Sequence, residues 1–328
     1  MATRQEIAEA RKPYTVTESN VNKDIPNGCD LRAAKDYYLA LYDNFESRLP
    51  APKYYPSPER DDIFILDFAH GPCGLKAYGA EKFIAECPSD KILGYAAPRV
   101  GHAAEAIASL AEMYGKKAVF FSAASKQVTA HQAVVLGYEN TELRFVRIPA
   151  MPTLNVWIQY WAKKFKATAL PFGLAKTPEV TAGLVNMCDY HTMMHGEPTE
   201  FYCAVSTGTM IRALQIGWPN AKAVGVAVAR NIQTGEKGPA EVTTYHRGFY
   251  QTSDHMPEFN TTCTYDAKAY KKFVNEAKPG AVFINVGSDQ QIETRLKKVK
   301  GWKKIDGVRV WGDQSAFEHA FGEYPNDK

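Results

Sequence analysis

The stretch Val205-Ser206-Thr207-Gly208-Thr209-Met210-Ile211-Arg212 decides how the rest of this chain is interpreted. The apolar run at residues 201–205 predicts a buried strand, and residues 211–216 predict a helix. A turn rich in glycine and hydroxyl groups between strand and helix suits a phosphate group. Backbone N–H groups at a helix start point toward a bound anion, and glycine lets the ligand approach closely. The turn therefore indicates an anion site, although many such turns hold no ligand.

The composition of the chain sets bounds on its class. It has 328 residues, enough for one large domain or two smaller ones, and 45% of them are hydrophobic. A net charge of +3 gives no indication of a nucleic-acid or membrane surface. The basic cluster at residues 297–304 is interpreted as a solvated helix face. No apolar run is long enough for a membrane span, and residues 1–12 lack the apolar core of a signal peptide.

The cysteines indicate a reducing environment. None of the six has the close spacing of a zinc knuckle or a redox dithiol, so they are interpreted as small core residues. We therefore expect a cytoplasmic protein with no membrane association. The residues are Cys29, Cys73, Cys87, Cys188, Cys203 and Cys263.

Strands and helices alternate along most of the chain, which is typical of α/β proteins with parallel sheets. Strands are predicted at residues 63–68, 91–96, 117–122, 143–148, 201–205, 223–228 and 281–286, and helices at 31–45, 103–114, 126–136, 156–166, 211–216 and 267–277. A further helix is expected to hold Lys76. The Pro-rich residues 49–58 predict an extended connection, and residues 170–200 a looser segment between two lobes. We expect two largely parallel sheets flanked by helices.

Ligands in such folds bind beyond the carboxyl ends of the strands. Residues 70–76, 97–102 and 206–210 each follow a predicted strand, so we expect them to meet at one cleft. Lys76 follows the turn His70-Gly71-Pro72-Cys73-Gly74 and opens a helix. The helix dipole and partial desolvation favour the neutral amine, which a Schiff base requires. An exposed helix lysine remains the alternative.

The order and spacing of these motifs resemble the fold type II, or tryptophan-synthase-β-like, pyridoxal-phosphate (PLP) enzymes, over roughly residues 60–290. Threonine and serine dehydratases, and cysteine and cystathionine synthases, belong to this family. The resemblance implies a large cofactor-binding domain of residues 1–78 and 167–328, and a smaller mobile domain of residues 79–166. It also implies PLP as the cofactor and a homodimer.

The resemblance assigns roles to individual residues. Lys76 falls at the Schiff-base lysine, and Ser206, Thr207, Gly208, Thr209 and Met210 fall on the phosphate loop. Residues 99–102 fall on the loop that grips the cofactor ring and the substrate carboxylate. Gly101 stands where the family usually has an asparagine bonded to the ring hydroxyl, and Thr209 and Met210 stand where it often has Gly and Thr. Val286 stands where the family offers Ser or Thr to the pyridine nitrogen, with Asn285 or Ser288 as substitutes.

Three side chains are candidates for substrate binding. Arg99 can pair with a carboxylate or phosphate through its planar guanidinium, or it is a surface arginine. His102 lies in the same loop, and His70 is near enough to Lys76 in sequence to line the same cleft or to serve as a structural histidine. His191 and His195 have the i, i+4 spacing of metal ligands, with Asp189 or Glu197 as a third. Because no glutamate follows His191 directly, the pattern is not the metalloprotease motif, and no metal is predicted.

The resemblance implies a PLP-dependent lyase or transferase that acts through a Schiff base on Lys76. It would act at the α- or β-carbon of an amino acid, or of an amino-acid-like group on a larger molecule such as a modified nucleobase. The departures at Gly101 and Val286 leave an alternative open: an inactive, cofactor-free scaffold for a phosphorylated ligand or a protein partner. An oxidoreductase is disfavoured, because the Gly-x-Gly-x-x-Gly fingerprint is absent from the sequence.

Overall fold

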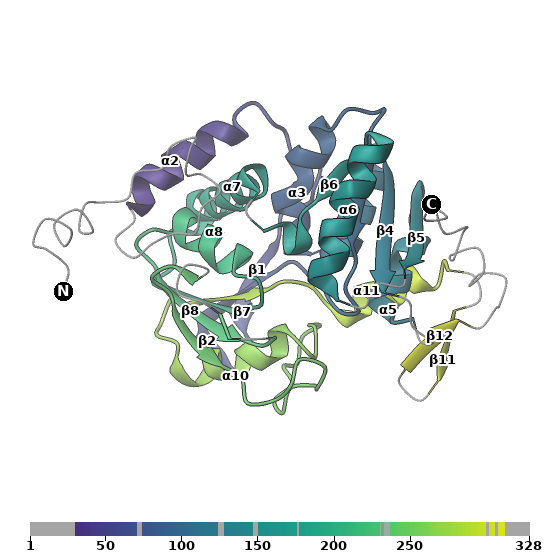
Figure 1. Ribbon diagram of the computed structural model, residues 1–328. Coiled ribbons are helices and arrows are strands. Elements are labelled where there is room, and N and C mark those ends of the chain that lie inside the picture. The colour runs from purple at the N-terminus through teal and green to yellow at the C-terminus, as the bar shows by residue number, and fades with distance from the viewer. Residues whose placement is uncertain are drawn as a thin grey trace, which may run out of the picture.

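Two mainly parallel sheets organise the fold of this computed structural model (Figure 1). The structure describes residues 30–70, 74–123, 128–146, 150–175, 177–229, 231–232 and 237–299, and the backbone of residues 302–305 and 308–311. Cys29, Gly71, Pro72, Cys73 and residues 126–127 of the expected helix lie outside the described residues. The expected α/β class with largely parallel sheets is confirmed.

The larger sheet has six strands in the order β1-β2-β10-β7-β8-β9. They are β1 (Lys53–Ser57), β2 (Arg60–Asp67), β10 (Val282–Asn285), β7 (Glu200–Val205), β8 (Lys222–Ala227) and β9 (Glu241–Thr244). All pair in parallel except β1, which runs antiparallel to β2 at the edge. Every residue of β7 and β10 is buried, because helices cover both faces of the sheet.

The smaller sheet has four parallel strands in the order β5-β4-β3-β6. They are β5 (Thr141–Val146), β4 (Lys117–Ala123), β3 (Ile92–Ala96) and β6 (Thr168–Leu170). Helix α6 (Met151–Phe165) packs against β3 so closely that a Cβ on Gly94 would lie 2.6 Å from the Trp161 ring. Helix α4 (Ala103–Met113) is buried along its length between this sheet and α3 (Leu75–Glu86).

Four helices pack together beside the larger sheet: α2 (Leu31–Tyr42), α3, α7 (Pro178–His195) and α8 (Thr209–Gly217). Figure 1 shows them grouped on one side, with α10 (Asp266–Glu276) on the other. The backbones of α3 and α7 touch, because a Cβ on Gly183 would lie 2.5 Å from the Tyr78 carbonyl oxygen and 2.7 Å from that of Gly79. This contact holds α3, the helix that carries Lys76, directly against α7.

The structure differs most clearly from the sequence-based expectations in three segments. Residues 170–200 were expected to be loose, but they contain the 18-residue helix α7. Its buried residues fall on nearly every side, so the one-sided apolar spacing used to find helices is missing. Residues 49–58 contain the edge strand β1, where Pro56 is tolerated. The helix expected at 126–136 is represented by α5 (Ala130–Ala133) and a 3₁₀ turn, η1 (Val134–Gly137).

The C-terminal part adds helix α11 (Asp289–Leu296) and a hairpin of β11 (Trp302–Ile305) and β12 (Val308–Trp311). Cys87, Cys188 and Cys203 are buried free thiols, as expected of core cysteines, and Cys263 is half-buried. Among the described residues, no helix is both long enough and apolar enough to cross a bilayer.

Candidate active site

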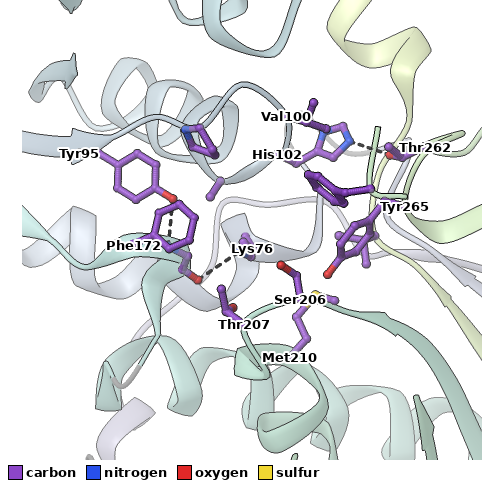
Figure 2. Close-up of a pocket in the computed structure, with 16 residues that line it drawn as sticks. Lys76, Tyr95, Val100, His102, Phe172, Ser206, Thr207, Met210, Thr262 and Tyr265 are labelled. Carbon is purple, nitrogen blue, oxygen red and sulfur yellow. Dashed lines mark hydrogen bonds between the residues drawn. The ribbon is translucent and has the colours of Figure 1, made fainter. Parts of the chain in front are cut away.

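A cavity lies where strands of both sheets end (Figure 2). Lys76 at the start of α3 lines it, together with residues that directly follow β3, β6, β7 and β10. Two of the segments expected to meet, residues 97–102 and 206–210, both contribute to its wall. The full lining is Lys76, Tyr95, Pro98, Val100, Gly101, His102, Ala103, Phe172, Gly173, Ser206, Thr207, Met210, Phe249, Thr262, Tyr265 and Val286.

Lys76 is held in place by the start of its helix. Gly74 precedes α3 with φ 74°, and the Leu75 N–H donates a 2.9 Å hydrogen bond to the Val286 carbonyl oxygen. A Cβ on Gly74 would lie 2.5 Å from that oxygen, so only glycine lets α3 begin against the end of β10. Val286 therefore fixes Lys76 through the backbone while its own side chain lines the cavity.

The Lys76 side chain is half-buried, and its Nζ donates a 3.1 Å hydrogen bond to the Gly173 carbonyl oxygen. Loss of hydration lowers the pKa of Lys76 from 10.5 to about 8. With that pKa, roughly a tenth of the amines are neutral at pH 7, against fewer than about one in a thousand at the ordinary value. The amine is thus suited to attack a carbonyl or to accept a proton.

The turn between β7 and α8 presents backbone N–H groups to the cavity. Gly208 has a left-handed φ of 76°, and no side chain in the described residues caps α8. The first N–H groups of any helix lack intrahelical partners, so those of α8 remain available to a ligand. A small second cavity adjoins the first, lined by residues 204–211 with Lys76 and Tyr265. The geometry suits an anion beside the Lys76 amine.

Gly173 is a site residue that sequence reasoning missed. Its carbonyl accepts from Lys76, and its N–H donates a 3.1 Å bond to the Tyr95 hydroxyl. A Cβ on Gly173 would lie 2.9 Å from the Thr207 methyl carbon. Gly173 therefore connects Lys76, the small sheet and the β7–α8 turn. Strand β6, which precedes it, has only three residues and gave no sequence signal.

His102 lies in the cavity wall as part of a hydrogen-bonded chain. Its Nε2 is 2.7 Å from Thr262 Oγ1, and its Nδ1 is 3.2 Å from Glu105 Oε2. His102, Glu105 and Thr262 are all buried. Sequence reasoning identified His102 but neither partner, because Thr262 is 160 residues away and Glu105 reads as a helix-surface residue.

Gly101 and Arg99 belong to the same loop as His102, but only Gly101 lines the cavity. Gly101 lines the cavity with φ 131°, a conformation that side chains rarely adopt, so an asparagine at this position would be strained. Arg99 is exposed and is not among the lining residues. Its carbonyl accepts a 2.5 Å hydrogen bond from Thr129 Oγ1.

The structure does not bring His70, Asn285 or Ser288 to this cavity. His70 pairs with Asp67 at 2.9 Å and, like Ser288, lines a separate polar cavity beside α4 and α11. Ser288 caps α11 by accepting from the Gln291 N–H. The buried Asn285 amide donates to Asp67 Oδ1 and to the Asn260 carbonyl, both at 2.8 Å, and its Oδ1 accepts from Thr261.

Asp266 is a buried carboxyl next to the cavity wall. It follows Tyr265, is fully buried, and neither of its oxygens has a hydrogen-bond partner within the described part of the chain. Burial raises the pKa of Asp266 well above its ordinary value, and the backbone N–H groups of Val286 and Gly287, which are near but outside hydrogen-bond geometry, oppose that rise. The carboxyl is therefore harder to ionise than an ordinary aspartate, and it lies close to the backbone of the cavity-lining Val286.

His191 and His195 pack among aromatic rings. The Tyr54 ring centroid lies 4.9 Å from that of His191 and 4.3 Å from that of His195. His191 also contacts Trp218, and desolvation lowers the pKa of His191 to about 4. Within the described residues, no group of three or more His, Cys, Asp or Glu side chains is arranged to hold a metal ion.

Comparison with known proteins shows the fold. No family model matches the sequence, and no protein of curated function matches it significantly. Among solved structures, threonine deaminase isoform 2 from Solanum lycopersicum is similar with a TM-score of 0.63 and 13% identity, over 88% of this chain and 97% of that one. Diaminopropionate ammonia lyase from Escherichia coli is similar with a TM-score of 0.56 and 12% identity, over 88% and 94% of the two chains.

Maize serine racemase is also similar, with a TM-score of 0.54 and 11% identity, over 84% of this chain and 98% of that one. These matches show that the chain has the tryptophan-synthase-β-like fold of the fold type II PLP enzymes, at low sequence identity. The fold class expected from the order of motifs is therefore confirmed. The similarity concerns the backbone architecture, and activity has to be argued from the site.

Proposed function

We propose that the protein binds PLP through Lys76 and acts as a lyase or transferase at the α- or β-carbon of an amino acid, or of an amino-acid-like group on a larger molecule. One observation carries the proposal. A lysine with a pKa of about 8 lies beside an uncapped helix N-terminus, in a cavity formed where strands of both sheets end. PLP carries an aldehyde and a phosphate on one ring. Its binding site therefore needs a reactive amine for the aldehyde and, nearby, an anion site for the phosphate.

The residues present fit this cofactor. The N–H groups at the start of α8 and the hydroxyls of Ser206, Thr207 and Thr209 suit the phosphate. The Lys76 amine suits the aldehyde carbon. Asp266 is an acid without a hydrogen-bond partner among the described residues, near the point where Val286 offers the pyridine nitrogen no polar side chain. When bound, PLP supplies the electron sink that stabilises a carbanion at the α-carbon.

The chain's own residues would supply binding and proton transfer. Once its nitrogen is free, Lys76 can take the proton from the α-carbon, because desolvation keeps its amine basic but partly neutral. The Gly173 carbonyl orients that amine by accepting its hydrogen bond. The rings of Phe172, Phe249 and Tyr265 exclude water from the reacting carbon.

A spectrum tests the proposal directly. Wild-type protein mixed with PLP should gain a visible absorption band that borohydride bleaches, and peptide mapping should find the reduced pyridoxyl group on Lys76. Lys76→Ala should lack both. Lys82→Ala is the matched control, since Lys82 lies on the same helix but bonds to the Asp43 carbonyl outside the cavity.

An absent band at saturating PLP would sink the proposal. The uncapped α8 terminus would then favour the other function that the sequence left open, a cofactor-free scaffold for a phosphorylated ligand. Protection of the apoprotein against thermal unfolding by inorganic phosphate, weakened in Ser206→Asp, would support that interpretation.

Three further properties belong to the same proposal: a homodimer, a cytoplasmic location, and a division into residues 1–78 with 167–328 and a mobile unit of residues 79–166. The small sheet supports the division in part: β3, β4 and β5 fall within residues 79–166, whereas β6 (Thr168–Leu170), which pairs with β3, lies just outside that range. Light scattering after gel filtration would test the dimer. Limited proteolysis with and without PLP would test the mobility.

A further inference from the structure

The chain Thr262–His102–Glu105 has the geometry of an activated hydroxyl. Thr262 Oγ1 lies 2.7 Å from His102 Nε2, and His102 Nδ1 lies 3.2 Å from Glu105 Oε2. Figure 2 shows the first contact at the wall of the cavity that also holds Lys76. A hydroxyl bonded to an imidazole, which is oriented in turn by a carboxylate, is the arrangement that makes a hydroxyl a proton donor or nucleophile.

The contact with Glu105 calls for a proton on His102 Nδ1, which donates to the carboxylate. The single proton of the Thr262 hydroxyl can be given either to His102 Nε2 or to the Gly287 carbonyl, which lies 3.2 Å away. The Tyr138 hydroxyl supplies a further donor to Glu105 Oε1 at 3.4 Å. The opposite tautomer would turn an unprotonated Nδ1 toward a carboxylate, which is unfavourable. When the hydroxyl donates to Nε2, the imidazole is a base for Thr262; when it donates to Gly287, a protonated Nε2 can donate to Thr262 Oγ1, so a proton can pass between the two in either direction.

The side chains that face the His102 ring beyond Thr262 and Glu105 are a second histidine and its carboxylate partner. The His131 ring is 5.2 Å away, but burial lowers the pKa of His131 to about 4, so it is neutral at pH 7. Asp289 lies 3.7 Å from His131 Nε2 and adds a second negative charge to that side. Gly287 packs against the imidazole, and a Cβ there would lie 3.3 Å from Nδ1. An imidazolium would face Glu105 with no cationic neighbour among these groups.

We propose that Thr262, His102 and Glu105 form a second acid–base unit of the active site, separate from Lys76. Its substrate role rests on the proposed function. The Thr262 hydroxyl gives its proton to a departing group on the β-carbon and receives the Nε2 proton of the His102 imidazolium. In the reverse direction a substrate proton passes to Thr262 as the hydroxyl proton moves to Nε2. One proton is transferred in each case, and Glu105 stabilises the imidazolium.

A thiol at position 262 tests the unit without any cofactor. In Thr262→Cys, an adjacent imidazole–carboxylate pair should lower the pKa of the introduced thiol from about 8.5 to about 7 or below. Alkylation of that thiol by iodoacetamide at pH 7 should then be roughly tenfold faster than in the double variant Thr262→Cys/His102→Gln. The neighbouring Cys263 is an internal reference, because burial and Asp289 raise its pKa to about 12.

Thr264→Cys is the matched control, since it places a thiol in the same segment at a position that does not line the cavity. Its alkylation rate should not depend on His102. Equal rates for the thiol introduced by Thr262→Cys, with and without His102, would overturn the proposal, because a purely structural histidine would not activate a neighbouring thiol. Circular dichroism would establish that the variants fold.

Nitrogen NMR of the unaltered apoprotein gives an independent measurement. With ¹⁵N-labelled histidine, and the His102 signals assigned by their loss in His102→Gln, we expect a proton on Nδ1. A proton on Nε2 with none on Nδ1 at neutral pH would contradict the proposal, because Nδ1 could then not donate to Glu105. Neither experiment involves PLP, so either can fail while Lys76 still binds the cofactor, and the reverse also holds.

Discussion

The Lys76 Nζ donates its hydrogen bond to the carbonyl of Gly173, which lies 97 residues further along the chain. The two atoms are 3.1 Å apart. A neutral carbonyl compensates only part of the hydration that the charge has lost, so the pKa of Lys76 falls to about 8. The bond both orients the amine and leaves it reactive.

The partly desolvated ammonium of Lys76 should make wild-type protein less stable than Lys76→Met. The folded pKa lies below the unfolded value of 10.5, so the folded state binds fewer protons between about pH 8 and 10.5. The penalty is fully present below pH 8 and is lost as pH rises to the unfolded pKa. We expect Lys76→Met to gain about 1–3 kcal/mol in urea unfolding at pH 7. A gain that stays unchanged at pH 10.5 would contradict this origin.

Gly173→Ala should loosen the site. The new Cβ would lie 2.9 Å from the Thr207 side chain, and φ is 67°, so we expect a loss of about 2–3 kcal/mol in unfolding free energy. Gly115→Ala is the matched control: its φ is also positive, at 63°, but nothing lies within 4 Å of its Cβ. It should lose only about 1 kcal/mol. Equal losses would mean that contact with Thr207 does not matter.

Ser206→Asp should weaken PLP binding by about tenfold or more. The new carboxylate would occupy the helix terminus proposed for the phosphate and repel the incoming anion. Fluorescence titration with PLP measures the change. Thr199→Asp places the same charge on an exposed residue outside the cavity and should bind as wild type does. Unaltered binding in Ser206→Asp would place the phosphate elsewhere.

Asp266→Asn should stabilise the apoprotein at neutral pH. Burial raises the folded pKa of Asp266 above its unfolded value, so its favourable contribution is complete below about pH 4 and is lost as pH rises through the folded pKa. Asparagine cannot ionise, so stability above pH 5 should increase by on the order of 1 kcal/mol and depend less on pH. Chemical denaturation from pH 4 to 8 would show whether the two curves diverge as expected.

Sequence reasoning was most successful where the signal lies within a few neighbouring residues. The strand β7, the turn at Gly208 and the helix α8 follow from apolar runs and one left-handed glycine, all within neighbouring residues. The placement of Lys76 at a helix start, and the alternation that defines the α/β class, came from the same kind of signal. The expected roles of these residues toward a cofactor stay predictions until the spectrum is measured.

The sequence by itself therefore determined the fold class, the position of Lys76 at a helix start and the hydroxyl-rich turn before α8, because each depends on spacing over a few residues. Only the tertiary structure decided which groups surround the lysine. Gly173, Thr262 and Asp266 reach the cavity region through contacts between distant segments. Asn285 instead donates a hydrogen bond to Asp67, and Ser288 caps the start of α11. Local propensity carries no information on such contacts, because they form only when two sheets and their connecting loops pack together.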